Sequence, residues 1–219
     1  MFAVIFEVKP KKERWDDYLE LARQLRPKLE AIDGFIDNER FGAIDEPGVL
    51  LSLSTWRDEK SVIRWRTQGE HHGVQEKGRF EVFEDYHLRV GEIIADNRPP
   101  KGSAVTDQRP DATEVGVGSL CTITQLSPAN PQPDALAKQL GLDPRAEGLI
   151  EHKVYDSITN PGHLLLFAVW RDATKWQPKS FADAGEIRHR EVRVIRDYGM
   201  FDRREAPQFY HKVGHRVPA

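Results

Sequence analysis

Three side chains that could do chemistry lie close together in the first third of the chain: Trp65, His71 and His72. Apolar residues recur around them in a polar setting, which predicts a helix over about residues 59–78. On one helix, Trp65 and His72 share a face about two turns apart. Because an imidazole can act as a general base near neutral pH, His71 and His72 are candidate catalytic residues, and Trp65 is a candidate substrate-binding wall. Alternatively, Trp65 packs beneath a sheet and both histidines are solvated.

A second set of candidates consists of polar residues inside predicted strands. Glu7 interrupts the apolar run 2–8, and Asn38 and Arg40 share one face of a strand predicted from residue 34. If these side chains point into the interior, they are buried polar groups that need a partner or a ligand. We therefore take Glu7, Asn38 and Arg40 as candidate substrate-binding residues. The alternative for Glu7 is an ion pair with a neighbouring arginine.

The elements that must position these residues are duplicated. Residues 34–58 align with residues 148–172 over 25 positions without a gap, at a constant offset of 114, and ten positions are identical. Each segment predicts a hairpin, because a Pro-Gly turn separates two apolar strands. Asp58 is then a predicted helix N-cap.

Flanking segments extend each copy to the order strand, helix, strand, strand, helix, strand. The first helix is predicted after the first strand, with a kink or restart near Leu25 caused by Pro27, and the last strand over about residues 80–94. The predicted fold class is α+β, with two tandem ferredoxin-like βαββαβ units whose apolar sheet faces cover each other in a closed barrel. The predicted segments are a first domain over 1–95, a linker over 96–115, a shortened second domain over 116–203 and a C-terminal tail over 204–219.

The two copies are unequal. Trp56 and His87 are 31 positions apart, whereas their counterparts Trp170 and His189 are 19 apart. Most of the second helix is missing from the second copy, and in the first copy this helix carries Trp65 and both histidine candidates. We therefore expect the first copy to line any pocket.

Composition narrows the function classes. The chain has 219 residues, 32 basic and 35 acidic, with a net charge of −3 and no tract of like charge, so nucleic acid is not expected as a partner. It has no run of about 18 apolar residues, so a membrane is not expected either. A single cysteine, Cys121, favours a reducing, cytoplasmic setting and is expected as a buried core thiol. Phosphate-binding glycine loops, zinc-ligand spacings and dinucleotide fingerprints are missing, so an oxidoreductase here is expected to work without NAD or FAD.

Several segments together resemble the antibiotic biosynthesis monooxygenase family. They are residues 2–8, 33–36, 39–41, 51–59, 65–66, 70–72, 75, 78–79 and, near the C-terminus, 194–203. The resemblance is closer over 1–95 than over 116–203, and it implies the dimeric α+β barrel fold, built here from one chain. The family includes cofactor-free oxygenases of aromatic polyketides, haem-degrading enzymes and members of unknown role.

The resemblance implies a cofactor-independent monooxygenase that uses oxygen and a small aromatic or phenolic substrate. In similar oxygenases a tryptophan on this helix and a polar side chain six residues later contact the substrate, and here that residue is His71. This histidine, or His72, would remove a phenolic proton and leave an anion that reacts with oxygen.

Two alternatives stay open. A haem-binding or haem-degrading protein would use His71 or His72 from a shifted position, because the family's usual ligand position is Gln75 and its usual first-strand asparagine is missing. A non-catalytic barrel would bind a small ligand or a protein. The aromatic, basic tail from residue 201 is expected to wrap the barrel or a second chain, so a homodimer is a further expectation.

Overall fold

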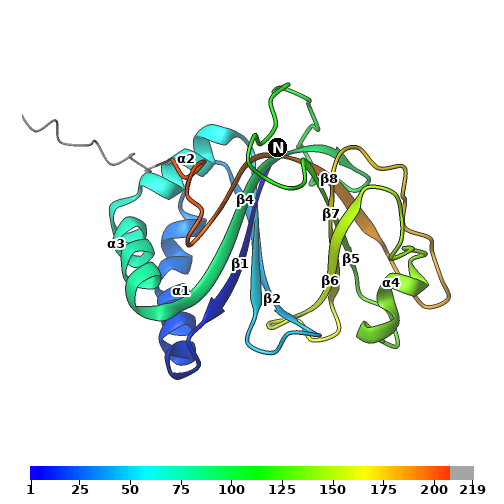
Figure 1. The fold of residues 1–219 in the computed structure, drawn as a ribbon, viewed down its shortest axis with the longest axis horizontal. Helices are drawn as coiled ribbons and strands as arrows, with labels where there is room; N and C mark the ends of the chain where they lie inside the picture. Colours follow the sequence, from blue (N-terminus) through cyan, green and yellow to red (C-terminus); the bar gives the residue numbers. More distant parts are fainter. Residues whose placement is uncertain (208–219) are drawn as a thin grey trace, which may run out of the picture.

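The computed structural model describes residues 1–207, and within them eight strands close into one barrel in the order β1–β3–β2–β6–β7–β5–β8–β4, with all neighbours antiparallel (Figure 1). The strands are β1 (Phe2–Pro10), β2 (Phe35–Ala43), β3 (Leu50–Trp56), β4 (Phe83–Asp96), β5 (Leu120–Leu126), β6 (Leu149–Ser157), β7 (Leu164–Trp170) and β8 (Arg188–Gly199). The predicted tail from residue 208 onward lies outside the described residues.

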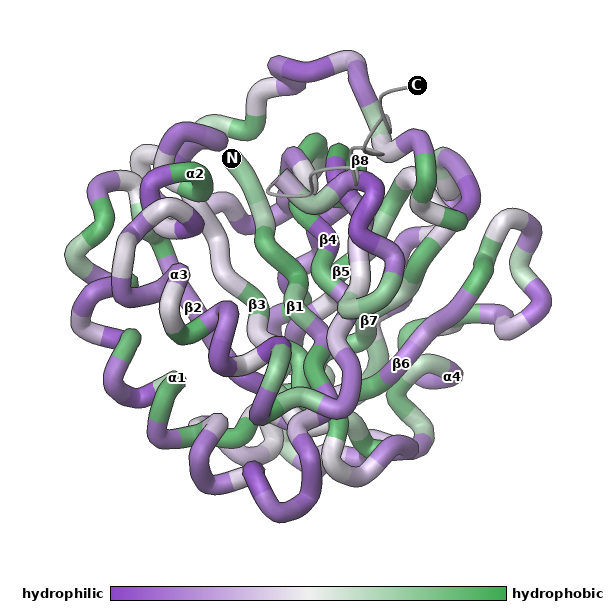
Figure 2. Tube along the Cα trace, turned by 60° about the vertical axis from the view of Figure 1, so that its left-hand side comes forward, coloured by the Kyte–Doolittle hydropathy of each residue, from purple (hydrophilic) through white to green (hydrophobic). Residues whose placement is uncertain are grey.

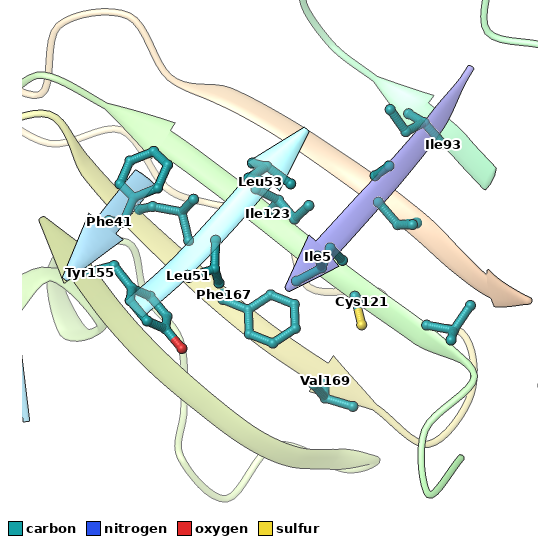
Figure 3. Packing of buried hydrophobic residues seen from close by; sticks show 14 of the residues in the cluster. Ile5, Phe41, Leu51, Leu53, Ile93, Cys121, Ile123, Tyr155, Phe167 and Val169 are labelled. Atoms are coloured by element: carbon teal, nitrogen blue, oxygen red, sulfur yellow. The ribbon is translucent and has the colours of Figure 1, made fainter. Parts of the chain in front are cut away.

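Each half supplies four neighbouring strands, and the halves join along β4–β8 and β2–β6. The two apolar sheet faces meet inside the barrel, where Ile5 and Leu51 of the first half pack with Ile123 and Phe167 of the second (Figure 3). Cys121 belongs to this cluster, and burial raises the pKa of its thiol to about 12. The predicted closed barrel and the predicted core thiol are both confirmed.

Three helices cover the outside of the first half (Figure 1): α1 (Trp15–Glu30), α2 (Glu59–Thr67) and α3 (Gly69–Lys77). Helix α1 follows a short 3₁₀ turn, η1 (Lys12–Arg14), and runs through Pro27 without a break, so the predicted restart near Leu25 is wrong. Pro27 lies in the last turn of the helix: it has no N–H to donate to the Arg23 carbonyl, and only three helical residues follow it.

The helix predicted over 59–78 is two helices, because the chain leaves helical geometry at Gln68. Asp58 caps α2 by accepting a hydrogen bond from the Ser61 N–H, as predicted. After α3 a π-helical turn, η2 (Gly78–Val82), reverses the chain, so β4 begins at Phe83 and not near residue 80.

The second half has less helix. A 3₁₀ turn, η3 (Pro133–Ala135), leads into the single turn α4 (Leu136–Gln139), and residues 171–187 contain no helix. Leu136, Leu140, Trp176 and Phe181 cover the outer sheet face instead. Hydrophobic residues gather in the strands at the centre, and the outer loops are mostly hydrophilic (Figure 2).

Gly34, at the start of the first hairpin, packs closely against α2, and we predict that its replacement destabilises the protein. Its φ is +89°, and a Cβ atom would lie 2.0 Å from Ser61 Oγ, which bonds the capping Asp58. Gly34→Ala combines left-handed strain with overpacking, so it should lower the free energy of unfolding by about 2–5 kcal/mol. Urea unfolding of the variant and the parent protein measures the difference.

Gly48→Ala is the matched control, because Gly48 has φ +92° and no atom lies within 4 Å of the place that an added Cβ would take. It should show the strain alone, about 1–2 kcal/mol. Equal losses in the two variants would contradict the close packing of Gly34 on α2.

Candidate active site

A cavity of about 680 Å³ lies between the first half of the sheet and the helices that cover it. Its floor is the outer face of the four strands β1, β2, β3 and β4, and its roof is formed by α1, α2 and α3. Tyr198, Arg203 and Pro207 line one side. The cavity therefore lies outside the barrel, in the half that was predicted to line a pocket.

One row of side chains crosses the floor from β2 to β8. Strand pairing sets Arg40 opposite Ser52, Ser52 opposite Phe6, Phe6 opposite Leu88, and Leu88 opposite Tyr198. Paired residues point to the same side of a sheet, and all five line the cavity. The row is polar at both ends and apolar in the middle.

A second row repeats this order one step along the strands. Asn38 pairs with Ser54, Ser54 with Val4, and Val4 with Val90, and all four line the cavity. The Asn38 amide nitrogen donates a hydrogen bond to Ser52 Oγ at 3.1 Å, which links the two rows. The polar end of the floor is therefore built from β2 and β3.

Trp65 and His71 form part of the roof, and the break between α2 and α3 brings them together. The Gln68 side chain caps α3 by accepting a hydrogen bond from the His71 N–H at 2.7 Å. The ring of His71 then stacks on Trp65 with centroids 4.0 Å apart and planes 16° apart. The predicted pairing of Trp65 with His72 assumed one continuous helix, and the structure pairs Trp65 with His71 instead.

The contacts of His71 determine which of its nitrogens carries the proton. Nδ1 lies 2.8 Å from the Trp65 carbonyl oxygen, which can only accept, so Nδ1 is the donor. Burial lowers the pKa of His71 to about 4, so at neutral pH Nε2 is unprotonated and can accept a proton. The Gln75 amide nitrogen donates a long hydrogen bond of 3.5 Å to this atom. His72 also lines the cavity but is exposed.

The cavity is rich in arginine. Arg26, Arg40, Arg66, Arg79 and Arg203 line it, whereas the only acidic residue among its described lining residues is Glu76. The Nε atoms of Arg40 and Arg66 are buried and have no hydrogen-bond partner within residues 1–207. This excess of positive charge favours an anionic or strongly polar ligand group.

The internal repeat provides a comparison for the polar floor. At the offset of 114, the pairs are Asn38/His152, Arg40/Val154, Ser52/Leu166 and Ser54/Ala168. In the second half, Val154, Leu166 and Ala168 are buried in an apolar cluster that fills the space beneath α4. The fold therefore does not require polar residues at these positions. Sequence reasoning missed Ser52 and Ser54, although this comparison between the copies would have identified both.

Glu7 does not line the cavity, because it lies on the other face of β1, inside the barrel. Its Oε2 lies 2.6 Å from Arg89 Nη1, and its Oε1 accepts a hydrogen bond from the Tyr155 hydroxyl at 2.7 Å. Burial alone would raise the pKa of Glu7, but the charges of Arg89 and Lys153 outweigh it and lower that pKa. Of the two interpretations of Glu7, the ion pair with an arginine is the one observed.

Within residues 1–207, no group of three His, Cys, Asp or Glu side chains is placed to hold a metal ion. The same part of the chain has no helix that is long and apolar enough to cross a membrane.

Comparison with known proteins gives several matches. The profile of the family described as antibiotic biosynthesis monooxygenase matches residues 1–77. "Jasmonate monooxygenase ABM" of Pyricularia oryzae is 44% identical over 216 residues, which cover 96% of this chain and 98% of that protein. "Uncharacterized protein YqjZ" of Bacillus subtilis is 30% identical over 92 residues, or 42% of this chain and 78% of that protein. A crystal structure of a "Putative monooxygenase" from Fusobacterium nucleatum aligns with 90% of this chain and with 93% of that protein's chain. The identity is 10% and the TM-score is 0.41, so this likeness carries no conclusion about function.

Proposed function

Because the chain belongs to the antibiotic biosynthesis monooxygenase family, we propose that it is a monooxygenase whose substrate binds in the cavity beneath Trp65 and His71. We propose a small, largely apolar substrate of the jasmonate kind, because the relative that aligns along almost the whole chain carries jasmonate in its name. The observation that supports this most is the cavity itself, which has a neutral imidazole in its roof and a floor that is apolar in the middle and polar at both ends.

A small aromatic or phenolic compound is the second candidate substrate. Phe6, Phe83 and Tyr86 form a cluster of rings along one wall, and Trp65 lines the same cavity. Aromatic walls suit a flat ring, which packs against them in stacked or edge-to-face geometry.

The residues of the cavity support base-assisted oxidation. His71 Nε2 is the proposed proton acceptor, and the hydrogen bond from Nδ1 to the Trp65 carbonyl holds the ring in position. Apolar side chains around it exclude water from the anion that proton loss creates. The step balances without a reductant when a CH₂ group next to a carbonyl or an aromatic ring becomes C=O: the substrate gives up four electrons and two protons, one oxygen atom of O₂ enters the product and the other leaves as water. We therefore propose this oxidation, for which no cofactor is required.

The test is oxygen uptake by the purified protein after dialysis against EDTA, with no flavin or nicotinamide added. Jasmonic acid, a hydroquinone and an anthrone are compared, and ¹⁸O₂ labels the product. We expect uptake with jasmonic acid and one labelled oxygen atom in its product. The absence of uptake with all three compounds would contradict the monooxygenase proposal for this cavity. Uptake that requires added flavin and NADH would contradict only its cofactor-free part.

Haem binding is the alternative that the cavity also invites, because His71 and His72 both line it. A haem titration followed in the Soret region separates the two proposals. We expect no saturable spectral shift at stoichiometric haem, because the unprotonated His71 nitrogen already accepts a hydrogen bond from Gln75 and belongs to a stacked ring. A saturable shift that is lost in His71→Phe would favour haem binding.

A further inference from the structure

We infer that Arg40, together with the hydroxyl groups of Ser52 and Ser54, binds a carboxylate of the substrate, so that the protein acts on a free acid and discriminates against its ester. This inference rests on the proposed function for the location of the substrate, and it names the substrate class and the residue that selects it.

The hydrogen bonds of the floor leave donors free. Ser52 Oγ accepts from the Asn38 amide at 3.1 Å, and Ser54 Oγ accepts from Trp56 Nε1 at 2.9 Å. Each serine hydroxyl therefore has its own proton available for a further acceptor in the cavity. Arg40 is paired with Ser52 on the neighbouring strand, and its guanidinium group contacts the Tyr18 hydroxyl, but its buried Nε has no partner within residues 1–207. A guanidinium beside two available hydroxyl protons fits a group that only accepts, such as a carboxylate.

The other cavity arginines are less suited to this role. Arg203 already donates to the Tyr86 hydroxyl, Arg26 bonds Glu30, and Arg79 packs over the exposed ring of Phe80. Arg66 also has a buried Nε without a partner, but it lies on α2 in the roof, away from the serines. Arg40 pairs with Ser52 on β3, and its carbonyl oxygen accepts a hydrogen bond from the Ile158 N–H at 2.9 Å, so backbone bonds on both sides fix its position.

The comparison between the halves shows that this polar cluster is not a requirement of the fold. Its counterparts Val154, Leu166 and Ala168 pack against Leu136 in an apolar cluster. In the first half the same positions hold two hydroxyl groups and a guanidinium whose buried Nε has no partner within residues 1–207. Burying these polar groups costs desolvation free energy, and the second half avoids this cost. A bound anion would offset this cost.

The order of the floor residues also orients the substrate. From Arg40 on β2 the floor passes Ser52 on β3 and reaches Phe6 on β1 after two strand spacings, roughly 10 Å. Trp65 packs against the same apolar cluster as Val4 and Val90, and His71 stacks on Trp65. A substrate whose carboxylate is bound by Arg40 therefore places its apolar part, and not the carboxylate, next to His71, the proposed base.

The experiment measures binding, so that it does not depend on turnover. Jasmonic acid and its methyl ester are titrated by isothermal calorimetry against the parent protein, Arg40→Met and Arg66→Met, with thermal melts as a check on folding. We expect the parent protein to bind the acid about 10–100-fold more tightly than the ester, the ratio given by one or two hydrogen bonds to a charged group. Arg40→Met should bring that ratio close to one, and Arg66→Met should keep most of it.

Equal affinity of the parent protein for acid and ester would overturn the inference, and so would loss of the preference in Arg66→Met but not in Arg40→Met. Arg40→Lys is measured as well, because it keeps the charge and should restore part of the acid preference if Arg40→Met is poorly folded. If the acid preference depends on Arg40 but neither compound is oxidised, the carboxylate site stands and the proposed reaction fails. If both compounds are oxidised and both bind with equal affinity, the proposed reaction stands and the carboxylate site fails.

Discussion

His71→Phe should lower kcat for the oxidised substrate by about 10²–10⁴-fold, the contribution typical of a positioned general base. Phenylalanine preserves the ring that stacks on Trp65 at 4.0 Å, so the roof of the cavity should keep its shape. It removes Nε2, the nitrogen that can accept a proton. Steady-state oxygen uptake measures the loss. His72→Ala should lose far less, because its ring is exposed and makes no stacking contact with Trp65.

The pH profile tests the same residue independently. Burial lowers the pKa of His71 to about 4, so the neutral, basic form persists through the weakly acidic range. As the pH falls through about 4, protonation removes the lone pair and kcat/KM should fall with it. A solvated histidine would instead give a fall near pH 6.5. A fall near 6.5, or activity in His71→Phe comparable to that of the parent protein, would exclude His71 as the base.

The fold could be predicted almost completely from the sequence. The ungapped repeat requires two units of one kind, and each unit has an apolar sheet face that only its counterpart can cover. The errors were local. One concerned Pro27, which lies in the last turn of α1 and does not restart the helix. The other concerned residues 59–78, where the helical spacing was continued through Gly69, a helix-breaking residue, although Gln68 ends one helix and caps the next.

The candidate site could be predicted only in part, and the reason lies in the geometry of strands. Alternation along β2 correctly places Asn38 and Arg40 on one face, but alternation does not say which face is the barrel interior. Both were considered as interior residues on condition that they point inward, and both face the helices instead. Glu7 does point inside, where Arg89 from a distant part of the sequence meets it. Which two charges meet across a barrel depends on register, and one chain's sequence does not reveal register.

Arg89→Met should lower the free energy of unfolding by about 3–5 kcal/mol, the loss typical of removing one partner from a buried ion pair. Arg89 is only 2% exposed and carries the central charge of the barrel interior. Its Nη1 lies 2.6 Å from Glu7, and its Nη2 lies 2.9 Å from Glu151. Its Nε lies 3.3 Å from Asp197 Oδ2, an ion-pair contact without hydrogen-bond geometry. Methionine removes the arginine charge that offsets the burial of Glu7 and Asp197, and leaves Lys153, 3.3 Å from Glu7, as a remaining positive charge beside Glu7.

The loss should depend on pH, and its sign follows from Glu7. In the parent protein the pKa of Glu7 is lowered, so its stabilising contribution is present at neutral pH and is lost as the pH falls through that pKa. In Arg89→Met the arginine charge is gone, and burial raises the pKa of Glu7. A fall in pH then protonates Glu7, which removes the cost of burying its charge. Urea unfolding of both proteins at pH 7.5 and pH 5 should therefore show a smaller difference at the lower pH. A difference that grows on acidification would contradict this account.

Glu7→Gln is the matched control, because it removes one of the three carboxylates and still offers an oxygen to the Tyr155 hydroxyl. It should cost less than Arg89→Met, since two carboxylates remain beside the arginine. The network also joins the two halves: Glu7 and Arg89 belong to the first, and Glu151, Tyr155 and Asp197 to the second. Because β1 and β4 carry this network on one face and the cavity floor on the other, a loss of contact between the halves should also disturb the floor. Substrate affinity in Arg89→Met should therefore fall together with stability, whereas Arg40→Met should change affinity alone.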